Sequence, residues 1–515
     1  MKKTVYRRLT NKKNKIARKL DQLIGGAEPL VEGNPEFSAG AGNIVYEVGD
    51  RTQAVSAGGI GAMKMLADDV GLTSAIDERL NILKIARPYQ DSDHVLNIAF
   101  NLLCGGNCLD DIEIRRNDTA YLEALGARSI PDPTTAGDFL RRFSESQLWS
   151  LMHTINAARV NVWQRAGIAK GTARIDADGT IVPTLGECKE GMDMSYKGLW
   201  GYHPLVVSLA NTNEPLFIVN RSGNRPSHEG APQVLTEAVE LCRSAGFTDV
   251  LLRGDTDFSM TAHLDAWHDD GVRFVFGYAS NKSFENRAEA MPDVEYEGLV
   301  RKAELLFEAR DPKPAERAKQ PRVKEAIVEK RGYLNRKLLW EDTAEFHHKP
   351  SKAKNTYRIV VLRKRVVDKH GQTTTESKYV YFFYVTNDWS LTQQQVIFEA
   401  NQRCNQENLL GGLKGDVRAL RAPINTFNGN WAHMVIASLA WNLKVWFGLL
   451  LPITPRWKEK HEAERDMVVK MEFRTFLQHF ILIPAQIVRT GRRLVYRFLA
   501  WRPNMPIFFR FLDAL

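Results

Sequence analysis

Hydrophobic residues recur at helical spacing through the first third of the chain. From Ala57 to about Ala166 they return every three or four positions, in segments such as GAMKMLADDVGL, SDHVLNIAFNLL and TAGDFLRRFSESQLWSLMHTINAARVNVW. The pattern predicts a helical domain over residues 51–168, a candidate for DNA binding. Residues 1–50 before it combine a basic arm with a stretch rich in glycine and proline, which predicts an arm and a linker.

The hydrophobic period changes from helical spacing to alternation at Thr172. The segments TARIDADGTIVPTL, GYHPLVVSLA and LFIVN read as three strands, with the turn NTNEP joining the last two. APQVLTEAVELCRSAG then reads as a helix and FTDVLLRGD as a fourth strand. This β-β-β-α-β order is that of a ribonuclease H-like sheet, in an α/β fold. A helix over Met260–Asp269 and a strand over 273–279 continue the alternation, so residues 169–280 are predicted to form the first part of the core.

The alternation lapses over residues 281–378, which are charged, contain prolines and include the strand-like segment YRIVVLRKRV. This region is predicted to be a β-rich insertion. The apolar strand YVYFFYVTND and a helix from about Thr392 to Leu410 then return the chain to the core, whose second part is assigned to residues 379–450. Residues 451–515 are predicted to form a basic helical C-terminal region. The most apolar window, Met434 to Leu451, contains Asn442 and Lys444, and predicts a buried amphipathic helix rather than a membrane span.

Charge is distributed unevenly over these regions. The 515 residues include 70 Lys and Arg against 61 Asp and Glu, a formal charge of +9. Cations gather in residues 1–24, between Lys313 and Lys369, and at a C-terminal group made of Arg489, Arg492, Arg493, Arg497 and Arg502. Clustered cations favour nucleic acid as a partner over an anionic membrane, although any one cluster is also typical of a solvated face.

The sequence argues against export, a zinc site and a nucleotide cofactor. The five cysteines are scattered, as expected in a reducing cytosol, and the close pair Cys104 and Cys108 lacks the further ligands of a zinc site, so both are expected to be buried. No apolar segment follows the basic N-terminus, so we expect a cytoplasmic protein that is not exported. The glycine pairs lack the spacing of nucleotide-binding loops, which argues against a nucleotide cofactor.

Pairs of aspartates on two predicted strands suggest a metal site. Asp176 and Asp178 are two residues apart and share one face of a strand, and Asp255 and Asp257 have the same relation at the end of the fourth strand. Carboxylate oxygens suit Mg²⁺, and two such ions can cleave a phosphodiester bond. Glu407, far downstream, is the candidate third acid.

Two cations accompany Glu407 on the predicted helix. Arg403, Glu407 and Lys414 are spaced by four and seven residues, which places them on one helical face. A surface salt bridge explains the Arg–Glu pair equally well, and an aspartate at a strand end is often only a turn residue. A Ser-His-Asp hydrolase built on His203 or His228 lacks a G-x-S-x-G string.

Together these motifs resemble the insertion-sequence DDE transposases, which have a ribonuclease H-like core and a β-rich insertion before the last acid. The family's D-x-T element matches Asp178-Gly179-Thr180, its second acid matches Asp255 in RGDTDF, and its Y-(2)-R-(3)-E-(6)-K signature matches Arg403, Glu407 and Lys414. The resemblance covers roughly residues 80–450. The signature tyrosine is replaced by Ala400, and Gly411 and Gly412 are expected to interrupt the helix, which makes Lys414 the least secure of the three matches.

The resemblance implies an activity and its partners. Asp178, Asp255 and Glu407 would hold two Mg²⁺ or Mn²⁺ ions, with Asp176 and Asp257 as alternates, while Arg403 and Lys414 would contact DNA phosphates. The enzyme would cleave the terminal inverted repeats of its insertion sequence and join the freed 3′-OH to target DNA, working as a homodimer in a synaptic complex. A non-transposing nuclease of the same fold and a catalytically inert DNA-binding protein are the competing interpretations.

Overall fold

The computed structural model describes residues 53–85, 88–301, 336–368, 378–491, 493–499 and 501–515, with the single positions 11, 14, 15 and 18. The predicted basic arm and linker therefore lie almost entirely outside the described residues. The chain divides into two compact units. One comprises Met1–Gly167, Gly186–Glu190 and Gly411–Leu515, and the other comprises Ile168–Leu185 and Gly191–Leu410.

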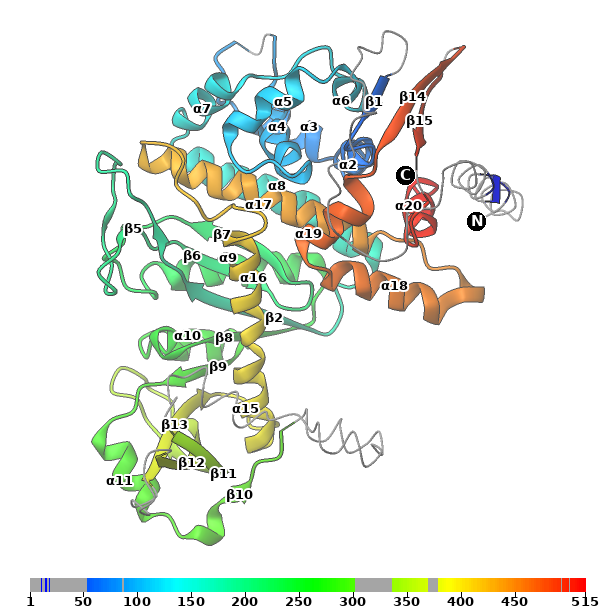
Figure 1. Ribbon diagram of the computed structural model, residues 1–515. Coiled ribbons are helices and arrows are strands. Elements are labelled where there is room, and N and C mark those ends of the chain that lie inside the picture. Colours follow the sequence, from blue (N-terminus) through cyan, green and yellow to red (C-terminus); the bar gives the residue numbers. More distant parts are fainter. Residues whose placement is uncertain are drawn as a thin grey trace, which may run out of the picture. The chain divides into compact units, whose positions relative to one another are not determined.

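The second unit is an α/β unit built on a nine-stranded mixed sheet, ordered β10-β11-β12-β13-β9-β8-β2-β6-β7 among the described residues (Figure 1). β2 pairs antiparallel with β6 and β6 with β7, while β8 and β9 run parallel to β2. The predicted mixed α/β sheet is thus confirmed. The strands are β2 (Thr172–Gly179), β6 (Leu205–Leu209), β7 (Glu214–Val219), β8 (Asp249–Gly254), β9 (Arg273–Tyr278), β10 (Glu297–Gly298), β11 (Arg336–His348), β12 (Tyr357–Asp368) and β13 (Lys378–Thr386).

Helices and short elements surround this sheet. The long predicted first strand ends at Gly179, and a separate three-stranded sheet ordered β3-β5-β4 follows it. The helix α9 packs on β2, β6, β7 and β8, and α15 packs on β8, β9, β11, β12 and β13. These elements are β3 (Val182–Pro183), β4 (Asp193–Met194), β5 (Trp200–Tyr202), α9 (Ala231–Ala245), the 3₁₀ turns η3 (Thr256–Phe258) and η4 (Asp293–Glu295), α10 (Leu264–Asp269), α11 (Lys282–Ala290), α15 (Gln393–Gln402) and α16 (Cys404–Lys414).

The β-rich character predicted for residues 281–378 is present, but its strands do not form a sheet of their own. β12 pairs antiparallel with β13, which pairs antiparallel with β9, so β11 and β12 lengthen the main sheet. Val360, Leu362 and Tyr384 pack in the same apolar cluster as Leu251 and Val396, and this shared core explains why the strands join the sheet. Residues 302–335 of the predicted insertion lie outside the described part of the chain.

The first unit is mainly helical, as predicted for residues 51–168. α17 packs against α2, α4, α7, α8, α18 and α19, and forms the centre of this unit (Figure 1). The helices are α2 (Ile60–Asp69), α3 (Leu72–Arg79), α4 (Asp91–Leu103), η2 (Leu109–Asp111), α5 (Ile112–Arg116), α6 (Thr119–Ala124), α7 (Pro133–Arg141), α8 (Glu145–Ala166), α17 (Phe427–Leu449), η5 (Pro455–Trp457), α18 (Lys458–Lys470), α19 (Phe473–Phe476), the π-helical η6 (Leu477–Ile481) and α20 (Met505–Leu512).

The C-terminal region is not wholly helical, which corrects the prediction for 451–515. β14 (Ala485–Thr490) and β15 (Arg493–Phe498) form an antiparallel hairpin, and β14 also pairs with β1 (Gln53–Val55). Gly491 at the turn has a φ of 55°, a conformation that favours glycine. The segment IVRTGRRLVY therefore carries a β-hairpin signal, with β-branched residues on either side of a glycine turn.

Helix α17 is buried on every side rather than amphipathic. All residues from Gly429 to Leu449 are buried because neighbouring helices surround it. The prediction of a buried helix is confirmed, and that of an amphipathic one is wrong. No helix among the described residues combines the length and the apolar character needed to cross a membrane.

Lys444 is a charged residue inside this buried helix. Its side chain is fully buried, and Nζ donates a 2.6 Å hydrogen bond to the carbonyl oxygen of Val469 and lies 4.8 Å from the ring centroid of Trp441. Burial lowers the pKa of Lys444 from 10.5 to about 7. Because the folded state disfavours the protonated amine, the stability associated with neutral Lys444 is fully present above pH 10.5 and is lost as the pH falls towards about 7.

We therefore expect Lys444→Met to stabilise the protein at pH 7 by roughly 3 kcal/mol, and by less as the pH rises towards 10. Urea denaturation of both proteins at pH 7, 8.5 and 10 measures this difference. Lys458→Met, at an exposed position of α18, is the control and should change little. A loss of stability in Lys444→Met at pH 7 would contradict the assignment.

Candidate active site

The candidate aspartates stand at the ends of two neighbouring parallel strands. Asp176 of β2 lies beside Arg253 of β8 in the parallel ladder, so the C-terminal ends of both strands lie at one edge. Asp178 is the next-to-last residue of β2, and Asp255 directly follows β8. The carboxyl ends of parallel strands are where α/β sheets place their ligands. The structure therefore brings Asp178 and Asp255 to the same edge of the sheet.

Asp176 forms a buried ion pair with Arg253. Its carboxylate accepts two hydrogen bonds from Arg253, from Nε at 2.6 Å and from Nη2 at 2.9 Å, and both side chains are 1% exposed. Arg253 also donates from Nη1 to Glu399 of α15 at 3.0 Å, and Glu399 in turn accepts from Arg174 at 3.1 Å. Asp176 and Arg253 thus form the buried centre of a network that extends through Glu399 to the partly exposed Arg174. This arrangement favours Asp178 over Asp176 as the ligand.

Asp255 caps a 3₁₀ turn. Its Oδ1 accepts the backbone N–H of Asp257 at 2.9 Å, and Asp255 is half-buried while Asp257 is exposed. Burial raises the pKa of Asp255. The charge of Arg403 and the hydrogen bond from the Asp257 backbone lower this pKa, while the charge of Asp257 raises it. The surroundings of Asp255 are those of a sheltered site carboxylate, whereas Asp257 points its side chain into solvent.

Arg403 is the cation of the site. Its Nη1 lies 3.5 Å from Oδ2 of Asp178. Burial raises the pKa of Asp178 from 3.8 to about 6; Arg403 counteracts this rise, and the charges of Asp255 and Glu407 add to it. Asp255, Glu407 and Arg403 are therefore all within electrostatic reach of Asp178, although the four residues come from three distant segments.

The helix that carries Glu407 is attached to the sheet by the residue before it. Gln406 is 1% exposed; its Nε2 donates to the carbonyl oxygen of Val206 at 2.9 Å, and its Oε1 accepts from the hydroxyl of Ser208 at 2.9 Å. Both partners belong to β6, the strand paired with β2 at Asp178. These two hydrogen bonds attach the first turn of α16 to β6. They thereby set the position of the neighbouring residue, the exposed Glu407.

The predicted single helix over 392–410 is wrong in two respects. It is divided into α15 and α16 at Arg403, the residue that caps the C-terminal end of α15. Gly411 and Gly412 do not interrupt α16, which runs to Lys414. A Cβ on Gly412 would lie 2.8 Å from the Trp441 indole, so packing favours glycine there.

Lys414 is the last residue of α16 and falls in the first unit, which begins again at Gly411. Ala400, at the signature's tyrosine position, packs against the apolar cluster of Val396 and Ile397. At that position the chain supplies packing rather than a hydroxyl.

Gly179, directly after Asp178, allows a close approach of side chains. A Cβ at this position would lie 2.8 Å from Nε2 of His203 and 3.0 Å from Oγ of Ser227. His203 is 3% exposed, and its Nδ1 lies 2.7 Å from the carbonyl oxygen of Arg225. His203 is therefore held by backbone groups. His228 is exposed, and the sequence gives neither histidine a nucleophile elbow, which removes the basis for a Ser-His-Asp hydrolase.

The donor chemistry of Asp178, Asp255 and Glu407 fits hard divalent cations, since all three offer carboxylate oxygens. No three His, Cys, Asp or Glu side chains within the described ranges already stand at ligand spacing. The three acids form an electrostatically coupled group whose excess negative charge is only partly balanced by Arg403. Cys104 is buried as predicted, whereas Cys108 is exposed because it begins the turn η2 at the surface.

Sequence reasoning missed the residues that support the site. Arg253 was readable, because an arginine within an otherwise apolar strand next to another buried strand requires a buried acid as its partner. Glu399 also carried a signal, since it lies one helical turn before Arg403. Gln406 and Ser208 carried none, because their pairing joins segments about 200 residues apart.

The raised pKa of Asp178 predicts that this residue destabilises the metal-free protein. A carboxyl whose pKa rises from 3.8 to about 6 on folding contributes stability below pH 3.8 that is lost as the pH rises through 6. In EDTA at pH 7.5, Asp178→Asn should therefore be more stable than the wild type by up to about 3 kcal/mol, and this gain should vanish near pH 4. Thermal denaturation across this pH range tests the prediction, with exposed Asp257→Asn as the control. A destabilised Asp178→Asn at pH 7.5 would contradict it.

The buried network predicts a larger effect of opposite sign. Arg253→Met leaves the carboxylates of Asp176 and Glu399 without their shared partner and should cost about 3–5 kcal/mol. Adding Asp176→Leu should restore part of this loss, since the isolated buried charge is then removed. Arg243→Met, which breaks the exposed pair with Asp270, should cost less than about 1 kcal/mol. Additive losses in the double variant, measured by urea denaturation, would show that the two residues are not coupled.

Comparison with known proteins shows the family of the chain. No curated protein matches the sequence. The cryo-EM structure of a piggyBac transposase synaptic complex with hairpin DNA is similar, with 11% identity, a TM-score of 0.37 and coverage of 82% of each chain. The family model of the transposase DDE domain, group 1, matches residues 41–515, which is most of the chain. The chain therefore belongs to the group 1 family of DDE transposases.

Proposed function

We propose that this protein is a metal-dependent DNA transposase whose catalytic acids are Asp178, Asp255 and Glu407. One observation carries the proposal: Asp178 and Asp255 end the parallel strands β2 and β8 at one sheet edge, and Glu407 and Arg403 are electrostatically coupled to Asp178 there. Bound at these carboxylates, two Mg²⁺ or Mn²⁺ ions would activate the attacking oxygen and stabilise the leaving oxygen of an in-line displacement at phosphorus.

The sheet supports a ribonuclease H-like core for this enzyme. In chain order β2, β6 and β7 form an antiparallel meander, α9 crosses over, and β8 and β9 add parallel strands on the other side of β2. The spatial order β7-β6-β2-β8-β9 puts β2 at the centre, with Asp178 at its end. We propose that the longer strands β11 to β13 are an elaboration of this core.

The side chains around the acids have separable roles. Arg403 offsets the charge of Asp178 and would contact a DNA phosphate near the scissile bond. Gln406 and the Arg253 network hold the acid-bearing segments and do not touch DNA in this scheme. The hairpin β14–β15 exposes Arg493 and Arg497, which offers DNA a second cationic surface.

The proposed reaction has two steps on one DNA strand. The site cleaves the end of the element and releases a 3′-OH, which then attacks a phosphodiester of the target DNA. We propose terminal inverted repeats as the substrate and a homodimer as the working assembly. A non-transposing nuclease would carry out only the first step, and an inert DNA-binding protein would carry out neither.

Cleavage of repeat-ended DNA by purified protein in Mg²⁺ or Mn²⁺ tests the assignment. Asp178→Asn, Asp255→Asn and Glu407→Gln should each lower the cleavage rate by more than about a hundredfold, since residues that only orient metal ligands already cost 10–100-fold. EDTA should abolish cleavage. Asp257→Asn is the matched control and should cleave like the wild type.

Each alternative gives a distinct result in this assay. Equal cleavage by Glu407→Gln and wild type would remove Glu407 from the site, and loss of activity in Asp257→Asn but not Asp255→Asn would exchange those two roles. Cleavage without strand joining would identify a nuclease. DNA binding without cleavage in either metal would identify an inert protein.

A further inference from the structure

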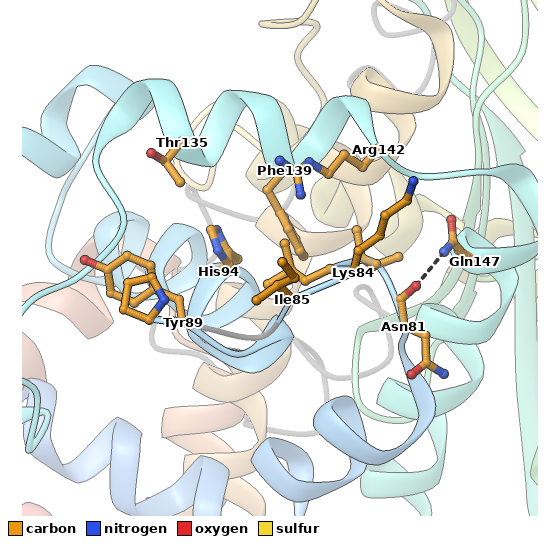
Figure 2. A pocket seen from close by; sticks show the side chains of 12 residues that line it. Asn81, Lys84, Ile85, Tyr89, His94, Thr135, Phe139, Arg142 and Gln147 are labelled. Atoms are coloured by element: carbon orange, nitrogen blue, oxygen red, sulfur yellow. Dashed lines mark hydrogen bonds between the residues drawn. The ribbon is translucent and has the colours of Figure 1, made fainter.

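The helical unit contains a pocket that the proposed strand chemistry does not use. Its volume is about 960 Å³, which falls within the size range of small-molecule sites (Figure 2). It lies among the loop before α4, the helix α4 itself, α7 and the start of α8. The lining residues are Asn81, Ile82, Leu83, Lys84, Ile85, Pro88, Tyr89, His94, Thr135, Phe139, Arg142 and Gln147.

One wall of the pocket is held in place by hydrogen bonds. The carboxylate of Asp91, the first residue of α4, accepts the backbone N–H groups of Ile82 at 3.0 Å and Leu83 at 3.2 Å. Gln147 donates from Nε2 to the carbonyl oxygen of Asn81 at 3.1 Å, as the dashed line in Figure 2 shows. The backbone at Asn81, Ile82 and Leu83 is therefore held by hydrogen bonds within the protein itself.

Aromatic rings form the interior of the pocket. His94 stacks on Phe139 with ring centroids 4.4 Å apart and an interplanar angle of 10°, and Tyr89 meets His94 edge-on at 5.8 Å. Figure 2 shows His94 between these two rings. The histidine is 3% exposed, and its Nδ1 has no hydrogen-bond partner. A buried nitrogen without a partner costs about 1–3 kcal/mol, which a ligand with a matching polar group would recover.

The protonation state of His94 suits a neutral hydrogen-bonding partner. Burial, aided by the charge of Arg142, lowers the pKa of His94 to about 4, so the ring is neutral at pH 7. A neutral imidazole offers one N–H donor and one acceptor nitrogen. The edge of a nucleobase offers the complementary groups.

All the charged residues of the lining are cations. Lys84 and Arg142 line the pocket, no Asp or Glu does so, and neither cation has an ion-pair partner among the described residues. A guanidinium and an ammonium together are suited to a phosphate group. The pocket thus combines a stacking surface, an unsatisfied polar nitrogen and an anion-binding pair.

We propose that this pocket binds a nucleotide, with its base against His94 and its neighbouring rings and its phosphate on Lys84 and Arg142. An unpaired nucleotide within a DNA strand and a free mononucleotide present the same chemistry. The DNA source rests on the proposed function, because it requires that the protein handle DNA, whereas the mononucleotide source does not.

The test compares two DNA duplexes that differ at one nucleotide, bound by the full chain in EDTA so that no strand is cut. One carries an unpaired 2-aminopurine and the other a fully paired one. Stacking of a base on aromatic side chains should favour the unpaired duplex about tenfold and quench its fluorescence. A parallel titration with dAMP shows whether a free nucleotide displaces the unpaired strand, which would identify the mononucleotide as a ligand.

Three variants locate the binding. His94→Phe keeps a ring but removes both nitrogens, and Arg142→Gln removes a cation; each should reduce the tenfold preference to about twofold or less. Arg79→Gln removes an exposed arginine of α3 outside the pocket and should keep the preference. Circular dichroism of each variant verifies that it is folded, and the ratio of the two duplex affinities is insensitive to a general loss of DNA binding.

The results separate this proposal from the proposed function. Equal affinity of the wild type for both duplexes together with no binding of dAMP overturns the pocket proposal, and so does an unchanged preference in both pocket variants. Binding of dAMP without binding of any DNA supports the pocket while overturning the transposase assignment. DNA cleavage that depends on Glu407, without any preference for the unpaired duplex and without binding of dAMP, supports the transposase assignment and overturns the pocket proposal.

Discussion

The buried ion network around Arg253 is the constraint on which the candidate site depends. A guanidinium that is 1% exposed is tolerated only when carboxylates surround it, and here Asp176 and Glu399 do so from a neighbouring strand and a helix. Arg253 thereby joins β2, β8 and α15 at one point. These are the segments that lead to Asp178, Asp255 and Arg403.

Each of three residues of the network lies shortly before a residue of the candidate site on the same strand or helix. Asp176 precedes Asp178 by two residues along a strand, Arg253 precedes Asp255 by two, and Glu399 precedes Arg403 by four, about one helical turn. Each supporting residue therefore has a counterpart in the site on the same segment. The paired aspartates that looked ambiguous in the sequence have different tasks: Asp176 holds the strands together, and Asp178 stands at their end.

The network around Arg253 and the candidate site differ in net charge. The network contains two carboxylates and two guanidiniums and is formally neutral, as a buried cluster must be to avoid a large desolvation cost. The site contains Asp178, Asp255 and Glu407 against Arg403, which leaves two negative charges. Burial is the main cause of the raised pKa of Asp178, and the negative charges of Asp255 and Glu407 add to it. A group that gains by binding divalent cations has this electrostatic character.

Much of this arrangement could be predicted from the sequence, because periodicity and strand order are local signals. The strands of 172–179 and 249–254, the crossover helix between them and the ends at Asp178 and Asp255 all followed from such signals. The errors arose where long-range packing decides. Gly411 and Gly412 both lie within α16, where Gly412 packs closely on Trp441. Residues 485–498 form a hairpin whose first strand pairs with β1, far away in the sequence. Neither contact can be predicted from the helix or strand propensity of the local sequence.

Arg403 also shows why a motif match alone could not assign roles. By sequence it belonged to a stripe with Glu407 and Lys414 on one helix, where a surface salt bridge would explain it. In the structure it ends α15, and its guanidinium faces Asp178 rather than Glu407. Its charge lowers the pKa values of Asp176, Asp178 and Asp255 alike. Arg403 is therefore a counter-ion shared by the neutral network around Arg253 and the acidic candidate site.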